Sequence, residues 1–141
     1  MDERAVVVLP QKFVALHWAS IKELLAPAIE FANGELEVED ILTLVADGKA
    51  FLVGDVVLDR LLWVAACECV SYPRRTVLNV IALGGRDLNV AIRELWGEIT
   101  EIAHRLGATS IRGAVRPSME RYYRRYAPEA RKAYVVMEKS V

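Results

Sequence analysis

The distribution of apolar and polar residues along this chain separates strand-like segments from helix-like ones. Residues 60–71 and 75–83 are rich in β-branched and other apolar side chains, which is typical of buried strands. Shorter segments of the same kind lie at residues 4–9, 50–53, 110–115 and 133–138. The pattern therefore predicts a sheet built around two long central strands.

Helical spacing of apolar residues marks the segments between these strands. Residues 13–32 repeat apolar positions at helical spacing, although Pro27 is expected to break or kink the run. Residues 38–46 predict a second helix that ends before Gly48, and Pro117 opens a short helix that reaches residue 126. The clearest stripe belongs to residues 88–106 and consists of Leu88, Ala91, Ile92, Leu95, Ile99, Ile102, Ala103 and Leu106. Helices and strands alternate in the second half, so we expect a helix-covered α/β or α+β sheet.

The segment between the strand at residues 77–83 and the helix at residues 88–106 is the most informative one. It reads Gly84-Gly85-Arg86-Asp87, and its two glycines are expected to let the backbone turn sharply. The first amides of a helix have no partner within the helix, and the helix dipole makes this end positive. Because Arg86 adds a formal positive charge, we expect an anion site here, and a phosphate-bearing ligand is the first candidate.

A second candidate feature lies in the two long strands. Residues 71–75 contain Pro73 and predict a hairpin turn, which would place Glu68 opposite Asn79. These two polar side chains interrupt otherwise apolar strands. A carboxylate at such a position costs free energy unless it faces solvent, a partner or a cleft.

Composition narrows the class of protein. The 141 residues carry a net charge of −1 and are 54% hydrophobic, which predicts one folded domain over residues 1–141 and gives no general attraction to nucleic acid or acidic membranes. There is no apolar run of membrane-spanning length and no signal-peptide pattern, so a cytoplasmic location is expected. Cys67 and Cys69 lie two residues apart in a strand, which disfavours a disulfide, and we expect no metal site.

The order of elements and two short motifs resemble the GNAT (Gcn5-related N-acetyltransferase) superfamily. The usual Arg/Gln-x-x-Gly-x-Gly/Ala signature after the fourth strand aligns with residues 86–91, where Arg86 and Ala91 match and Asn89 replaces the glycine. Asparagine is one of the few side chains that tolerate left-handed backbone angles. Near the C-terminus, Tyr123 stands where the family has a tyrosine and Arg125 where it has a lysine. The family's asparagine is absent there, and Ala127-Pro128 replaces Gly-Phe.

This resemblance implies a GNAT-type α/β fold, with a mixed, mostly antiparallel sheet and helices on both faces. It implies an acetyl-CoA-dependent N-acyltransferase that transfers the acyl group directly to an amine of a small molecule or a protein. Glu68 would be the general base, oriented by Asn79, and Tyr123 the general acid, with Tyr122 as a substitute. The coenzyme would contact Leu83, Gly84, Gly85, Arg86, Asp87, Leu88, Asn89, Val90 and Ala91.

An alternative reading comes from a different class of protein. In size and in its Tyr-Pro and Leu-Gly-Gly segments the chain also resembles small GNAT-like proteins of tailed bacteriophages. That resemblance implies a binding or virion-assembly component that has lost catalysis, in the host cytoplasm or the virion, with a homodimer or a virion protein as its assembly. A third, less favoured reading is a nucleic-acid interface formed by Arg112, Arg116, Arg121, Arg124, Arg125 and Arg131 with the neighbouring tyrosines. A solvated surface or a site for a coenzyme phosphate also explains this cluster.

Overall fold

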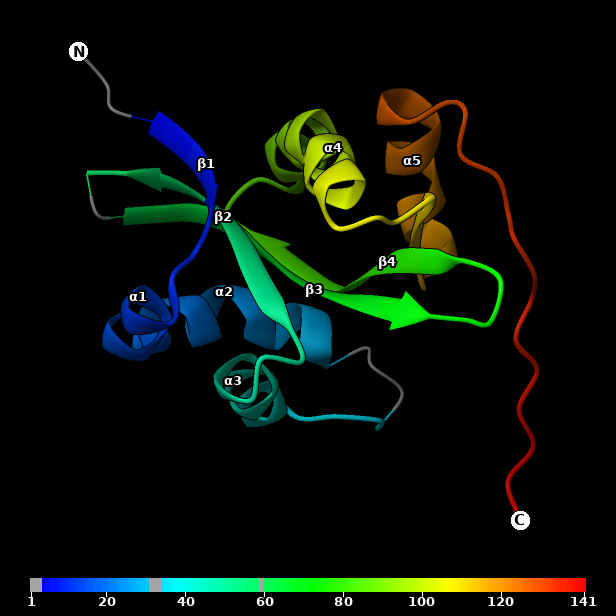
Figure 1. The fold of residues 1–141 in the computed structure, drawn as a ribbon, viewed down its shortest axis with the longest axis horizontal. Helices are drawn as coiled ribbons and strands as arrows, with labels where there is room; N and C mark the ends of the chain where they lie inside the picture. Colours follow the sequence, from blue (N-terminus) through cyan, green and yellow to red (C-terminus); the bar gives the residue numbers. More distant parts are fainter. Residues whose placement is uncertain (1–3, 31–33, 59) are drawn as a thin grey trace.

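A computed structural model describes residues 4–30, 34–58 and 60–141. Its five-stranded sheet has the order β1-β2-β3-β4-β5 (Figure 1). The strands are β1 (Arg4–Val8), β2 (Phe51–Val57), β3 (Arg60–Ser71), β4 (Thr76–Gly85) and β5 (Ser110–Gly113). Neighbouring strands from β1 to β4 are antiparallel, and only β4 and β5 are parallel. The predicted α/β class with a mostly antiparallel sheet is confirmed.

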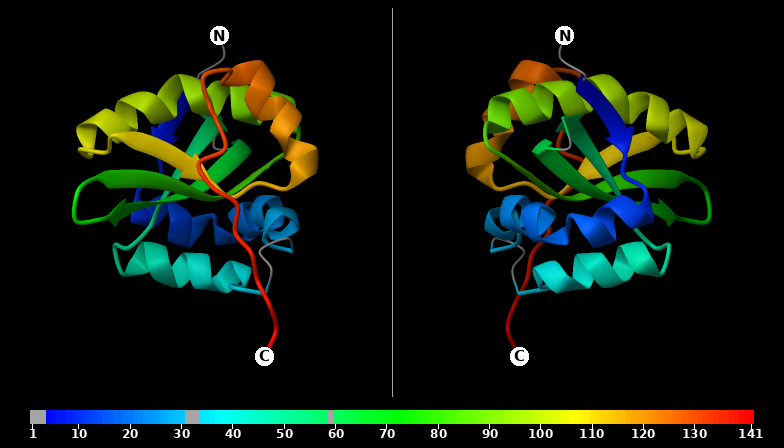
Figure 2. Two further views of the ribbon diagram at one scale, coloured as in Figure 1. Left: turned by 90° about the vertical axis from the view of Figure 1, so that its right-hand side faces the viewer. Right: turned by 90° about the vertical axis from the view of Figure 1, so that its left-hand side faces the viewer.

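Helices cover both faces of this sheet (Figures 1 and 2). One face carries α1 (Gln11–Leu16), α2 (Trp18–Ile29) and α3 (Val38–Ala46); the other carries α4 (Leu88–Arg105), a short 3-10 turn η1 (Pro117–Met119) and α5 (Glu120–Tyr126). The apolar residues form two cores, one on each face. Ile21, Leu25 and Ile41 are fully buried in the first core, and Trp63, Leu95 and Ile99 lie in the second. The stripe predicted on the helix of residues 88–106 is the buried face of α4.

The first helical run is interrupted at a different residue from the one predicted. The chain leaves helical geometry at His17, whose φ is −109°, and this residue separates α1 from α2. Pro27 lies inside the last turn of α2, which continues to Ile29. A proline removes one helical hydrogen bond, and near a helix end that loss does not stop the helix. The predicted end at residues 31 and 32 falls outside the described residues.

The central hairpin agrees with the sequence prediction. The turn is closed by a hydrogen bond of 2.8 Å from the Tyr72 amide to the Arg75 carbonyl oxygen. The register places Glu68 opposite Asn79, as the position of Pro73 predicted. The helix predicted at residues 38–46 is also confirmed with its bounds unchanged.

Four predicted segments differ from the structure. The strand predicted at residues 50–53 continues to Val57, and the one predicted to end at residue 115 ends at Gly113. The strand predicted at residues 133–138 is wrong, because residues 127–141 form no regular element. Gly84 and Gly85 were predicted to form a turn, but they are the last two residues of β4. The turn itself consists of Arg86 and Asp87.

Within the described parts of the chain, no helix combines the length and the apolar character needed to cross a membrane.

Candidate functional site

Strands β4 and β5 pair over only part of their length. Val77 to Val80 pair with Ser110 to Gly113, and the chain then leaves β5. Strand β4 continues to Gly85 while it remains paired with β3 on its other side. Among the described residues, no strand therefore pairs with residues 81–85 on the side of β5. The two strands separate after Val80, which leaves main-chain groups of β4 without a sheet partner along one edge.

Tyr123 lies at the point where these strands separate. A Cβ atom added to Gly113 would be 3.1 Å from the Tyr123 hydroxyl and 3.8 Å from the carbonyl oxygen of Val80. Helix α5 carries this tyrosine, and its ring packs edge-on against Trp96 of α4 with 5.6 Å between ring centroids. Burial raises the pKa of the Tyr123 hydroxyl, so the protonated form is favoured at neutral pH. The sequence placed this residue by a motif, and the structure places it where β4 and β5 part.

A side chain already occupies two of the amides at the start of α4, contrary to the expectation that these amides are free. Asp87 is the N-cap, and its Oδ1 accepts hydrogen bonds from the amides of Asn89 (3.0 Å) and Val90 (3.4 Å). The amide of Ala91 donates to the Asp87 carbonyl oxygen at 3.0 Å. A carboxylate therefore occupies the helix end that was expected to attract an anion. An aspartate before an apolar helical stripe is a strongly preferred N-cap, so the sequence did contain this signal.

The residues just before α4 also make close contacts within the protein. A Cβ on Gly84 would overlap the Leu24 carbonyl group of α2, so this glycine allows the helix backbone to rest on the strand. A Cβ on Gly85 would lie 2.8 Å from the Cβ of Trp63. The Arg86 amide donates to the Leu62 carbonyl oxygen at 3.2 Å, whereas the Arg86 side chain is exposed. The two glycines thus serve close packing, and Arg86 can offer a ligand its guanidinium group.

The remaining residues that the motif assigned to the coenzyme have mixed exposure. Ala91 is fully buried, while Leu83, Leu88, Asn89 and Val90 are half-buried.

A second tyrosine, Tyr126, contacts the first turn of α4. The sequence analysis did not identify this contact. The Tyr126 hydroxyl donates to Oδ1 of Asn89 at 3.2 Å, which joins the end of α5 to the first turn of α4. The Arg125 guanidinium lies over the Tyr126 ring, 5.4 Å from its centroid. Arg86 and Arg125 thus place two cationic side chains beside the same helix end. No sequence spacing reveals this pairing, because residues 89 and 126 come together only through the packing of α5.

Glu68 and Asn79 form a polar row that continues into a third strand. Asn79 is opposite Glu68 on β3 and opposite Arg112 on β5. Neighbours along β4 alternate between faces, and Leu78 and Val80 pack into the core beneath α4. Asn79 and Glu68 therefore point to the α2 side of the sheet, whereas Tyr123 lies on the α4 side. The predicted base and acid approach the separation of β4 and β5 from opposite faces.

A separate acidic hollow lies between β1, β2 and α4. It has a volume of about 470 Å³ and is lined by Val6, Asp55, Glu94 and Glu98. Asp55 is fully buried, and Glu94 accepts a 2.8 Å hydrogen bond from the Trp63 indole nitrogen. The sequence analysis missed this hollow, although an aspartate inside the apolar strand at residues 51–57 was a usable signal. None of its lining residues is among those that the motifs identified.

No protein-family model and no curated protein sequence matches the chain. Solved structures do match it. An aminoglycoside acetyltransferase from an uncultured soil metagenomic sample, in complex with sisomicin, superposes with a TM-score of 0.74 at 9% identity, covering 98% of this chain and 96% of that one. Ribosomal-protein-alanine N-acetyltransferase from Brucella melitensis biovar Abortus gives a TM-score of 0.71 at 14% identity, covering 98% and 99%.

An aminoglycoside N-acetyltransferase in complex with CoA gives a TM-score of 0.67 at 12% identity, covering 100% of this chain and 97% of that one. The similarity extends over the whole length of all three acetyltransferases, and it is one of structure and not of sequence. The chain therefore has the fold of the GNAT acetyltransferases.

Proposed function

We propose that the protein is an acyl-CoA-dependent N-acyltransferase that uses acetyl-CoA as its co-substrate. The observation that carries this proposal is the Tyr123 hydroxyl, which lies at the separation of β4 and β5 in a fold shared with acetyltransferases. Direct transfer requires a proton donor for the departing thiolate and an acceptor for the proton of the attacking amine. Tyr123 supplies the donor, because a tyrosine hydroxyl carries its proton at neutral pH, and burial raises the pKa of this one further.

The proton donor and the proton acceptor would act from opposite faces of the sheet. The thioester sulfur would lie on the α4 side, within reach of Tyr123. The amine would enter from the α2 side, where Glu68 takes its proton directly or through a water molecule and Asn79 orients the carboxylate. Residues 81–85 of β4 would offer main-chain groups to the extended arm of the coenzyme, with Leu83 among them.

The phosphates of the coenzyme would be held mainly by side chains. Arg86 and Arg125 flank the start of α4, while Asp87 already occupies the amides of Asn89 and Val90. The Asp87 carboxylate repels an anion at this position, so it weakens coenzyme binding. We therefore expect an affinity that rises when the negative charge of Asp87 is removed and falls when Arg86 is lost.

Calorimetric titration with acetyl-CoA and with CoA tests the coenzyme site. Asp87→Ser keeps an N-cap oxygen but removes the charge, and it is expected to tighten binding several-fold. Arg86→Ala is expected to weaken binding about tenfold, whereas Arg105→Ala removes an equally exposed charge at the far end of α4 and serves as the control. Absence of both heat and thermal stabilisation at millimolar coenzyme would contradict the proposal, because a ligand that binds the native state must stabilise it.

Release of free CoA thiol tests the chemistry. The amines to supply first are an aminoglycoside and a peptide with an N-terminal alanine, because structural neighbours are named for those acceptors. Tyr123→Phe is expected to lower kcat by roughly 10²- to 10⁴-fold, as for loss of a general acid. Tyr122→Phe is the matched control, since that hydroxyl accepts a hydrogen bond from Arg121 at the surface.

A second candidate function is a binding or assembly component that has lost catalysis, such as a virion protein of a bacteriophage. The occupied amides at the start of α4 favour it. This candidate predicts no coenzyme binding by either the natural protein or Asp87→Ser.

A further inference from the structure

The sheet face on which the amine is proposed to enter is covered by helices over only part of its length. The core beneath α1, α2 and α3 reaches Ala66 on β3 and Ile81 on β4. The β3–β4 hairpin extends beyond these helices (Figure 1). Glu68 and Asn79 lie on the hairpin side of this core, and both are half-buried. The charges of this part of the sheet therefore bear on which acceptors can bind.

Arg112 adds a positive charge to the same face. It lies opposite Asn79 in the register of β4 and β5, whereas its neighbour Ile111 packs into the core beneath α4. Side chains alternate along a strand, so Arg112 points to the same face as Asn79. The next residue is Gly113, beside which the Tyr123 hydroxyl lies. Arg112 is therefore one residue away from the point where β4 and β5 separate.

Two tyrosines orient the Arg112 guanidinium. Its Nη1 donates a 3.0 Å hydrogen bond to the Tyr72 hydroxyl, and its Cζ lies 5.6 Å from the centroid of the Tyr72 ring. The centroid of the Tyr134 ring is 5.2 Å from the same carbon. Contacts with aromatic rings orient a guanidinium without neutralising its charge. Because an arginine has five N–H donors, most of them remain available to a ligand.

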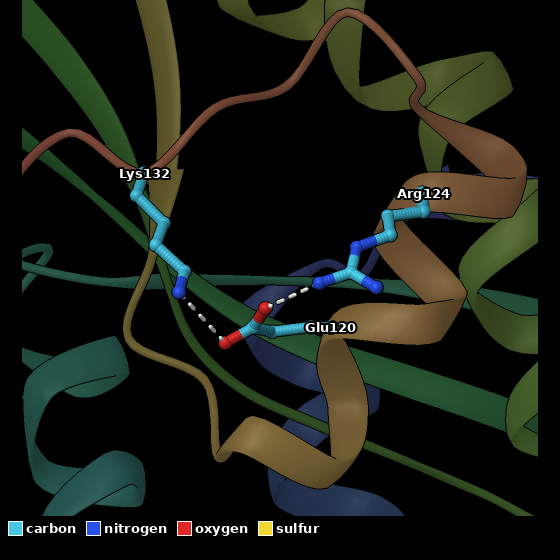
Figure 3. Close-up of polar contacts among 3 residues, drawn as sticks. All are labelled: Glu120, Arg124 and Lys132. Atoms are coloured by element: carbon cyan, nitrogen blue, oxygen red, sulfur yellow. Dashed lines mark hydrogen bonds and ion pairs between the residues drawn. The ribbon is translucent and has the colours of Figure 1, made fainter.

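The ion pairs of Glu120 help to keep Tyr134 in this position. Lys132 pairs with one carboxylate oxygen of Glu120 at 3.5 Å, and Arg124 pairs with the other at 3.0 Å (Figure 3). Lys132 precedes Tyr134 by two residues, so its ion pair joins the C-terminal segment to α5 shortly before the segment reaches Arg112. Two cations also neutralise the Glu120 carboxylate, which therefore adds no net negative charge here.

The charge of Arg112 is not neutralised within the protein. In the part of the chain that the structure describes, no carboxylate forms an ion pair with it. Glu68 lies two strands away, with Asn79 between them. Adjacent strands are about 4.8 Å apart, so the backbones at Glu68 and Arg112 are separated by about 10 Å. A ligand with an amine toward Glu68 and an anionic group toward Arg112 would pair with both charges.

We propose that the acceptor is an amine that also carries a carboxylate or a phosphate, and that Arg112 binds this anionic group. The amine lies beside Asn79, within reach of Glu68, and the anion lies one strand further, at Arg112. A separation of about 5 to 10 Å between the two groups fits a small amino acid or a dipeptide. This assignment rests on the proposed acyltransferase function and adds the class of its acceptor.

Pairs of acceptors that differ by one anionic group test the proposal. Alanyl-alanine is compared with its C-terminal amide, and O-phosphoethanolamine with ethanolamine, by release of CoA thiol from acetyl-CoA. We expect kcat/KM to be at least about tenfold higher for the anionic member of one pair, mainly through a lower KM. The pair that shows this preference distinguishes a carboxylate from a phosphate. Equal values within both pairs, or a preference for the polycationic aminoglycoside sisomicin, would overturn the proposal.

Substitution of Arg112 tests the residue. Arg112→Gln is expected to reduce the preference for the anionic member to less than about threefold, because the charge-assisted hydrogen bonds are lost. Arg112→Lys keeps the charge but not the planar fork, so part of the preference should remain. Arg74→Gln removes an exposed charge from the hairpin turn and is the matched control. A preference that persists in Arg112→Gln would overturn the assignment to this residue.

Calorimetry separates failure of this assignment from failure of the proposed function. Titration of the CoA-saturated protein with each of the four amines measures binding without turnover, and we expect tighter binding of an anionic amine that is lost in Arg112→Gln. If CoA binds and no anionic amine binds more tightly than its neutral partner, only the acceptor class is wrong. If CoA and acetyl-CoA do not bind, the proposed function is wrong. The same titrations without CoA then test Arg112, and absence of binding by both anionic amines overturns its role as well.

Discussion

On one face of the sheet, α1, α2 and α3 close a core in which helix backbone and strand backbone touch, whereas α4 and α5 cover the other face with polar groups among the apolar ones. Gly84 meets the Leu24 carbonyl on the first face. The second face holds the Trp63–Glu94 hydrogen bond, Tyr123 and the acidic hollow. The comparison teaches that the contacts of the first face serve mainly packing, although Glu68 and Asn79 also point to that side. Substitutions of buried apolar residues on the first face should therefore mainly affect unfolding, whereas substitutions of the polar groups on the second face should mainly affect ligand binding.

The largest effect on the free energy of unfolding is expected from truncation of a buried side chain of α2. Leu25 is fully buried in the core of the first face, so Leu25→Ala should lower the free energy of unfolding by about 2–5 kcal/mol in urea denaturation. Leu16→Ala on α1 is the control, since that side chain is 79% exposed and its loss should change stability by less than about 0.5 kcal/mol. Equal effects at both positions would show that α2 does not form the stabilising core.

The next largest effects on stability are expected at two glycines, one on each face. Replacing them by alanine should change the free energy of unfolding in opposite directions. Gly84→Ala places a methyl group against the Leu24 carbonyl and should destabilise the protein by about 1–3 kcal/mol. Gly97→Ala on α4 meets no atom within 4 Å and should stabilise it by about 1 kcal/mol through helix propensity. Thermal unfolding of both variants checks the pair. A neutral Gly84→Ala would mean that α2 can move away from β4 at no cost.

A smaller change is expected at Asp87, where β4 passes into α4. Asp87→Ala removes the cap of the Asn89 and Val90 amides and should cost about 1 kcal/mol. Asp87→Ser retains a capping oxygen and should stay within a few tenths of a kcal/mol of the natural protein. Chemical denaturation measures both. A stabilising Asp87→Ala would indicate that the carboxylate is not acting as a cap.

The smallest effect on stability at neutral pH is expected from substitution of Tyr123. Tyr123→Phe should change stability by less than about 0.5 kcal/mol at pH 7, because the hydroxyl makes no hydrogen bond among the described residues. The pKa of Tyr123 is raised in the folded protein, so the folded state retains the proton after the unfolded state loses it. Stability should therefore fall as the pH rises above about 10, the pKa of an unfolded tyrosine.

The phenylalanine variant should lose less stability than the natural protein over the same pH range. Denaturation curves at pH 8 and pH 11 measure this difference, with Tyr122→Phe as control. An identical loss in the natural protein and Tyr123→Phe would contradict the burial of this hydroxyl.

Local patterns predicted those features that depend on neighbours in the chain. The hairpin register followed from Pro73 and the alternation of two strands, and α3 and the buried stripe of α4 followed from apolar spacing. The strand predicted at residues 133–138 failed although its composition was suitable, because a strand needs a partner edge and composition does not provide one. Gly84 was read as a turn because close backbone contact and a sharp bend both call for glycine.

The order of strands β1 to β5, the register of the central hairpin and the presence of a polar pair inside it were determined by the sequence alone. Whether the amides at the start of α4 are free, which face Tyr123 occupies and which groups surround Asp55 were decided by the tertiary structure. The physical reason is the range of the interactions. Periodicity and turn chemistry act over a few residues, whereas the Tyr126–Asn89 hydrogen bond and the Gly84–Leu24 contact join segments that are brought together only when both faces of the sheet are packed.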